Sequence, residues 1–146
     1  MNSYQLNSID DVISALEEII SETERNNDPL GYFAVLYHKV TVNVKEGIEK
    51  NYFENGPRME KLDVVFARRY IDAFFARKPN QPVTQSWKKA FTISKNKNIL
   101  ILQHLLMGMN AHINLDLGIA AAEISTKENI HQLKNDFFVF YCGSSD

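Results

Sequence analysis

The sequence predicts an all-α fold, a bundle of five to six helices around a buried central helix at about residues 97–123. Apolar residues recur at intervals of three and four along most of the chain, which is the period of an amphipathic helix. The stretch 98–115 holds no charged side chain and is apolar on nearly all sides, which is typical of a buried helix. The 146 residues suffice for a single domain spanning 1–146, and no repeat or linker divides them.

The first two helices are marked by their starting residues. Ser8 suits an N-cap, and two aspartates follow it in the first turn of the helix. The polar run 24–27 ends this helix, and Asp28-Pro29 predicts the start of the second, because proline fits the first helical position. The β-branched run 41–44 also suits a strand, but the longer apolar period favours helix.

The later helices follow turns and breaks. The turn 54–57 leads to a third helix with one apolar face, formed by Met59, Leu62, Phe66, Tyr70 and Ala73. The two prolines of 79–82 predict a break, after which Thr84 or Ser86 caps a short helix carrying Trp87, Ala90 and Phe91. After the long helix, 125–128 forms a capping-box pattern that predicts a last helix.

Composition excludes several classes of protein. The net charge is −2 without a basic stripe, so we expect no nucleic-acid partner. The acidic N-terminus lacks the pattern of a secretory signal, and the single Cys142 cannot form an intramolecular disulfide; both fit a cytoplasmic protein. The polar side chains within 98–115 are costly in hydrocarbon, so we expect no membrane span.

The C-terminal segment departs from these patterns. Residues 137–142 are continuously apolar, and the chain then closes with Gly-Ser-Ser-Asp. This pattern fits either a buried terminal segment or the atypical end, at about 137–146, of a truncated longer protein. We favour the second interpretation.

Unusual chemistry is concentrated in residues 103–116. Placed on a helix at about 100° per residue, the polar side chains form two stripes on an otherwise apolar surface. One stripe holds Gln103, Asn110 and Asn114; the other holds His112 and Asp116, with His104 at an edge between them. Burying such groups without partners costs roughly 1–3 kcal/mol each, so each must meet a polar side chain, water, a ligand or a metal ion. Gly108 and Gly118 are expected to permit close approach by a neighbour.

The spacing of His112 and Asp116 predicts a metal site. An imidazole and a carboxylate four residues apart on a helix can reach one divalent ion, zinc or manganese, and a bound water would then support hydrolysis. His104 or the inward-facing Asp63 would complete the ligands. The alternative is that Asp116 orients His112 in a structural hydrogen-bond network.

A second candidate lies on the third helix, where Arg69 precedes Tyr70. A guanidinium facing a cavity suits a carboxylate or phosphate, so these two residues are candidates for holding an anionic ligand. The alternative is that the arginines of this helix make surface contacts only.

Three runs together resemble a known family. They are RMEKLDVVFARRYIDAF, the short SWKKAF, and LQHLLMGMNAHINLDLGIA, of which GMNAHINLD is the most specific part. The chain resembles, from about residue 33 to residue 136, the bacterial all-helical family of unknown function DUF5995. That resemblance implies a helical fold and carries no activity. The His-x-x-x-Asp pair alone is similar to pairs in the zinc-dependent phospholipase C and single-strand nuclease superfamily, although the further histidine pairs of that superfamily are missing.

Three functions stay open at this point. One is a metal-dependent hydrolase acting on a phosphoester or similar anionic substrate. Another is a non-catalytic module that binds a small molecule between the third and the long helix, with Gln103, Asn110 and Asn114 as its polar wall. The last is a structural or interaction protein whose core polar groups fix helix register.

Overall fold

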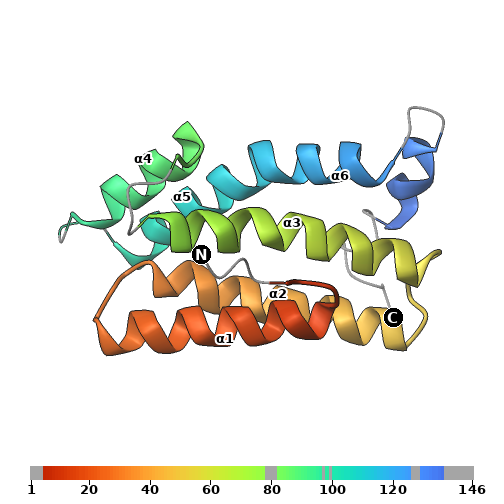
Figure 1. Ribbon diagram of the computed structural model, residues 1–146, viewed down its shortest axis with the longest axis horizontal. Coiled ribbons are helices and arrows are strands. Elements are labelled where there is room, and N and C mark those ends of the chain that lie inside the picture. Colours follow the sequence, from red (N-terminus) through yellow and green to blue (C-terminus); the bar gives the residue numbers. More distant parts are fainter. Residues whose placement is uncertain (1–4, 78–81, 97, 99, 126–128, 137–146) are drawn as a thin grey trace.

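The computed structural model describes residues 5–77, 82–96, 98, 100–125 and 129–136, and of Leu102 and Asn114 it describes the backbone alone. In these residues the elements are α1 (Ile9–Arg25), α2 (Gly31–Glu49), α3 (Gly56–Ala76), α4 (Gln85–Ser94), α5 (Ile101–Ala111), the π-helix η1 (His112–Leu117), α6 (Gly118–Ile124) and the 3-10 helix η2 (Ile130–Gln132). The predicted all-α bundle is confirmed (Figure 1).

Local sequence explains where the first three helices begin. Ser8 caps α1 with a reciprocal capping box to Asp11, as its position predicts. The α2 helix begins at Gly31 rather than at Pro29, because the carboxylate of Asp28 accepts from the Leu30 amide at 3.0 Å and holds a turn there. The side chain of Asn55 accepts from the amide of Arg58 at 3.0 Å and starts α3.

Other boundaries follow the expected pattern with small changes. The run 41–44 is helical, within α2, and Thr84 occupies the N-cap position of α4. The long helix runs from 101 to 124 as α5, η1 and α6 in succession. The capping pattern predicted at 125–128 and the segment 137–146 lie largely or wholly outside the described residues.

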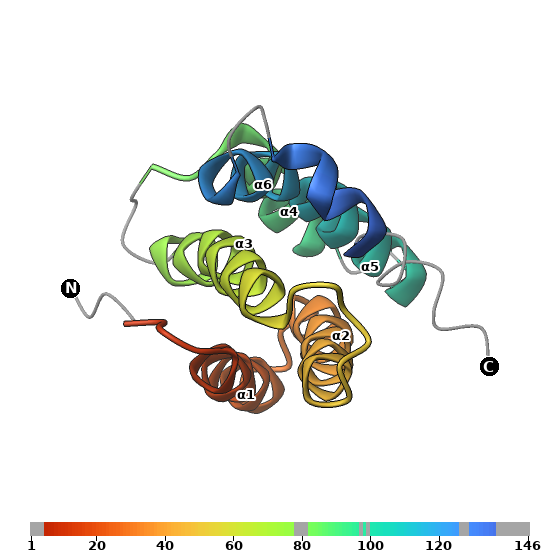
Figure 2. The same cartoon turned by 90° about the vertical axis from the view of Figure 1, so that its right-hand side faces the viewer.

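The helices form two layers on either side of α3. The α1–α2 pair lies below α3, α4 and α6 lie above it, and α5 lies to the side of α3 and packs on α2 (Figure 2). Helix α3 packs against α1, α2, α6 and η1, whereas α5 packs against α2 and α4. The aromatic core therefore forms around α3, whose buried residues include Phe66, Tyr70 and Phe74.

The helix at the centre of the bundle is not the one that the sequence predicts. We predicted that the helix at about 97–123 would be buried on all sides, but its outer face is exposed, with Leu106 54% and Ile113 37% exposed. The middle of the bundle belongs to α3, because α3 packs on both α1 and α2 on one side and on η1 and α6 on the other. None of the described helices is both long enough and apolar enough to cross a bilayer.

The last described segment is tied to the start of α3. Arg58 donates to a carboxylate oxygen of Asp136 at 2.6 Å and to the backbone carbonyl of Gln132 at 2.7 Å. The other oxygen of Asp136 accepts from the Glu54 amide at 2.7 Å. Leu133, between these contacts, is buried, so this segment belongs to the packed fold.

Candidate functional site

Asp116 is the centre of a buried polar network that joins three elements. One of its oxygens accepts from Nε of Arg69 on α3 at 2.8 Å. The other accepts from Nε1 of Trp87 on α4 at 2.7 Å and lies 3.2 Å from Nδ1 of His112 on η1. Asp116 itself has no exposed surface. The carboxylate therefore fixes α3, α4 and η1 to one another.

The partners of Asp116 keep it ionised. Burial alone would raise the pKa of this carboxyl, but hydrogen bonds from His112, Trp87 and Arg69 outweigh burial and hold its pKa below the ordinary value of 3.8. A buried carboxylate is stable only when it is paired in this way. The anionic partner that Arg69 holds in this structure is thus Asp116.

His112 sits in a box of aromatic rings. Its imidazole stacks on Phe66 with centroids 3.6 Å apart and planes 6° apart, and the Tyr37 ring meets it at 4.7 Å. Phe33, Tyr70 and Trp87 complete the box, with their ring centroids between 5.8 and 6.0 Å away. Burial lowers the pKa of His112 below its ordinary value, although the hydrogen bond to Asp116 opposes the shift.

The protonation of His112 follows from these contacts. A neutral imidazole carries one proton, and the carboxylate beside Nδ1 can only accept, so the proton belongs on Nδ1. Nε2 then presents a lone pair, and it is buried without a hydrogen-bond partner among the described residues. His112 and Asp116 therefore meet in a buried hydrogen bond, which is the contact that an orienting role of Asp116 requires.

The segment that carries His112 and Asp116 is a π-helix. Residues His112–Leu117 form i→i+5 bonds in the middle of an otherwise α-helical run. Such segments are common at functional sites, because they hold one more residue per turn than the α-helices that flank them. The π-helix therefore marks the same motif that the sequence singled out.

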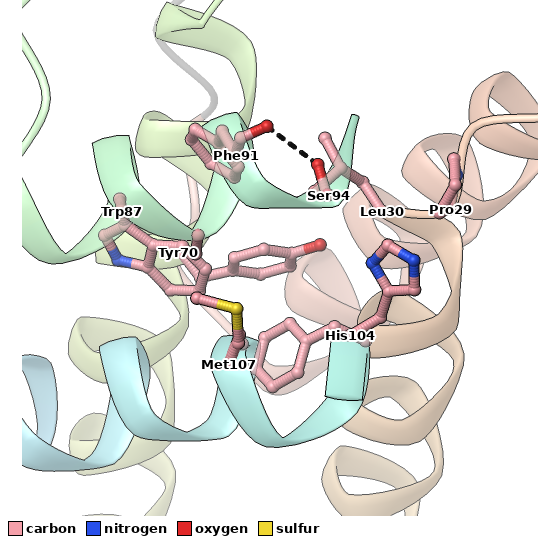
Figure 3. A pocket seen from close by; sticks show the side chains of 11 residues that line it. Pro29, Leu30, Tyr70, Trp87, Phe91, Ser94, His104 and Met107 are labelled. Carbon is pink, nitrogen blue, oxygen red and sulfur yellow. Dashed lines mark hydrogen bonds between the residues drawn. The ribbon is translucent and has the colours of Figure 1, made fainter. Parts of the chain in front are cut away.

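A small pocket adjoins this network between α2, α3, α4 and α5. Tyr70, Trp87, Ser94, His104 and Met107 contribute to its wall, together with apolar residues (Figure 3). The cavity measures about 20 Å³, enough for one or two water molecules. Trp87 belongs to both features, because its ring lines the pocket while its Nε1 donates to Asp116.

The Tyr70 hydroxyl is the unsatisfied group of this pocket. It is buried without a hydrogen-bond partner among the described residues, and Figure 3 shows it pointing toward His104. Burial raises the pKa of Tyr70, so the hydroxyl keeps its proton and can donate. Ser94, at the same pocket, donates its own proton to the Phe91 carbonyl at 2.8 Å, which leaves its oxygen able to accept.

The residues predicted as further metal ligands are placed apart from Asp116. His104 lies about three helical turns before Asp116, with its ring 6.1 Å from that of Tyr32. Asp63 is buried on α3, and burial, with the nearby charge of Glu60, raises its pKa to about 7. The described part of the chain contains no group of three or more His, Cys, Asp or Glu side chains placed to hold a metal ion.

The predicted polar wall faces outward instead. Gln103 and Asn110 are exposed on α5, and neither lines the pocket. Gln103 accepts from the Leu100 amide at 2.9 Å and so caps the start of α5. The side chain of Asn114 lies outside what the structure describes. Tyr70, in contrast, lines the pocket and supplies a buried polar group there, its hydroxyl.

The two glycines of the motif differ. A Cβ on Gly108 would lie 2.6 Å from ring atoms of Phe33, so the expected close approach is confirmed there. A Cβ on Gly118 would meet nothing within 4 Å, so the same expectation was wrong for Gly118. The sequence analysis placed Trp87 on a short helix but did not predict that its Nε1 donates to Asp116.

These features define an all-helical protein with a buried Asp–His–Trp–Arg network beside a small aromatic pocket. Residues 9–140 match the model of the family of unknown function DUF5995, and the chain belongs to that family. The match extends beyond the expected 33–136 at both ends. No curated protein and no solved structure matches the chain.

Proposed function

We propose that this protein binds a small molecule in the pocket between α2, α3, α4 and α5. The observation that carries the proposal is the Tyr70 hydroxyl, a buried donor at the wall of a cavity that has no partner among the residues the structure describes. Leaving such a group unsatisfied costs roughly 1–3 kcal/mol, which a ligand oxygen or nitrogen would recover. Aromatic walls with a few placed polar groups are typical of small-molecule sites.

The Asp116 network supports this function by holding the pocket in shape. Trp87 cannot turn away from the pocket without giving up its bond to Asp116. Met107, on the facing helix, is unbranched and can adjust to a ligand that enlarges the cavity. One wall is thus fixed and the other is adaptable, an arrangement suited to binding with limited rearrangement.

Trp87 is the single tryptophan of the chain and serves as a built-in reporter. Small neutral and charged molecules are titrated into the protein. We expect the fluorescence of Trp87 to change saturably for each molecule that enters the pocket. Filling the cavity from the α5 side with Gly108→Leu would block binding but would also disturb Phe33, so Ser94→Leu is the better blocking variant. The proposal fails if no compound of a diverse set shifts Trp87 in the wild type, or if Ser94→Leu binds as the wild type does.

The metal-dependent hydrolase stays a prediction. His112 offers a buried Nε2 lone pair, but the oxygens of Asp116 already accept from Arg69 and Trp87. With Nδ1 of His112 these donors occupy three of the roughly four acceptor positions of the carboxylate, so a metal would have to take the remaining one or displace a donor. Metal analysis of protein purified without an affinity tag tests it: absence of stoichiometric divalent metal, with a melting temperature unchanged by zinc or manganese, removes this function and leaves the pocket proposal intact.

A further inference from the structure

The pocket is lined without formal charge. Among the described residues that form its wall, none is Asp, Glu, Lys or Arg. Lys95 directly follows Ser94, but it is exposed and does not line the cavity. A charged group placed inside would lose its hydration without meeting an opposite charge, which is costly in a protein interior. The wall therefore selects a neutral group.

The polar atoms of the pocket select a group that both accepts and donates. Tyr70 has a proton to give and no acceptor in the described part of the chain, whereas the Ser94 oxygen can still accept because its proton goes to Phe91. A cavity of about 20 Å³ has room for a group the size of one or two water molecules. An alcohol hydroxyl has both this size and this hydrogen-bonding capacity.

The rim of the pocket is apolar and exposed. His104 lies at the wall, and the ring of Tyr32, 42% exposed, rests 6.1 Å from it. Ile101 precedes His104 by three residues on α5, so the two are neighbours on that helix, and Leu100 is the N-cap residue directly before it. Leu100 and Ile101 are 69% and 53% exposed. Large apolar side chains gathered at the edge of a cavity are suited to an apolar ligand body.

We propose that the pocket takes a neutral amphiphile, an aliphatic alcohol or a molecule of the same chemistry. Its hydroxyl enters between Tyr70 and Ser94, and its hydrocarbon chain lies over Tyr32, Leu100 and Ile101. This inference rests on the proposed binding function and adds the class of the ligand. It assigns the Tyr70 hydroxyl as the recognition donor.

The test compares three probes with the same chain and different head groups: 1-octanol, octanoate and octylammonium, each below its aggregation concentration. Titrations follow the fluorescence of Trp87 in the full chain. We expect saturable binding of 1-octanol, with octanoate and octylammonium at least about tenfold weaker. Shorter alcohols should bind more weakly, by up to about fourfold for each methylene that leaves the rim.

Two variants separate recognition from packing. Tyr70→Phe removes the donor and keeps the ring, and we expect it to weaken 1-octanol about three- to tenfold. Tyr37→Phe is the matched control, because Tyr37 is a buried tyrosine that packs on Tyr70 but does not line the pocket. It should bind 1-octanol as the wild type does. The double variant Leu100→Ser with Ile101→Ser should lose the dependence on chain length.

The outcomes distinguish this inference from the function on which it rests. If octanoate or octylammonium binds as tightly as 1-octanol, or if Tyr70→Phe binds 1-octanol unchanged, the alcohol class is wrong while a binding pocket remains. If none of the three probes binds but other compounds shift Trp87, the ligand class is again wrong. If nothing shifts Trp87, the pocket itself is not a binding site.

Discussion

Asp116 and Tyr70 are both buried polar side chains in the same part of the molecule, and they differ in their partners. Asp116 has donors from α3, α4 and η1, whereas the Tyr70 hydroxyl has none among the described residues. A carboxylate that accepts from three donors inside the protein stabilises the fold and has little acceptor capacity left for a ligand. The difference suggests separate roles: Asp116 holds the pocket residue Trp87 in place, whereas Tyr70 has the hydroxyl that would bind a ligand.

The largest effect should come from removing the Asp116 carboxylate. Asp116→Ala leaves the guanidinium of Arg69 half-buried and unpaired and removes the acceptor of Trp87. We expect the free energy of unfolding to fall by about 3–5 kcal/mol, measured by urea denaturation. The matched control is Asp10→Ala, which breaks an exposed pair with Lys45 and should cost less than about 1 kcal/mol. Equal losses in the two variants would contradict the central role of Asp116.

Asp63 offers a pH-dependent contrast with Asp116, since burial raises the pKa of Asp63 to about 7. The folded chain holds this proton more tightly than the unfolded chain, whose pKa is near 3.8. The stability that this more tightly held proton contributes is fully present below about pH 4 and is lost as the pH rises through 7. The gain of Asp63→Asn relative to wild type should therefore grow from about 1–2 kcal/mol at pH 5 to about 4 kcal/mol at pH 7 and above. Parallel stability profiles for the two proteins would disprove the shift.

Gly108 and Gly118 give a smaller comparison along one helix. Gly108→Ala forces a methyl group against the Phe33 ring and should cost about 1–3 kcal/mol by overpacking. Gly118→Ala meets open space and should instead stabilise the helix by up to about 1 kcal/mol. Thermal unfolding of the two variants measures both effects. A stabilised Gly108→Ala would mean that α2 and α5 are not in close contact there.

The smallest effect on stability should come from Tyr70→Phe. Because the hydroxyl bonds to none of the described residues, its removal should leave the free energy of unfolding unchanged or raise it by up to about 1 kcal/mol. The measurement is chemical denaturation without added ligand. A loss above about 2 kcal/mol would show that the hydroxyl is already bonded, and the contrast with Asp116 would disappear.

Much of the fold follows from local signals in the sequence. Ser8 and Asn55 begin helices because their side chains accept from amides within the next three residues, so no distant contact is needed to predict them. The inward face of α3 follows from apolar spacing, and Met59, Leu62 and Phe66 are buried. The start of α2 lies later than predicted, because the turn held by Asp28 takes the place of the first helical residues.

The site depends on contacts that a single helix pattern cannot contain. The partners of Asp116 come from α3 and α4, 47 and 29 residues away in the chain. The polar stripes were placed at a constant 100° per residue, which does not hold within a π-helix. The apolar surface of the long helix was also expected to be buried on nearly all sides, but Leu106 and Ile113 are exposed. Gln103 and Asn110 consequently face outward.

The π-helix has a consequence for the phase of the long helix. Because one turn at 112–117 holds an additional residue, the side chains after it are rotated by about 100° from where a continuous α-helix would carry them. The first half of this helix therefore packs on α2 and α4, and the second half packs on α3. In an alignment of family members, a single-residue gap within 112–117 would mark chains that lack this change of phase, and in those chains the two halves could not face both neighbours at once.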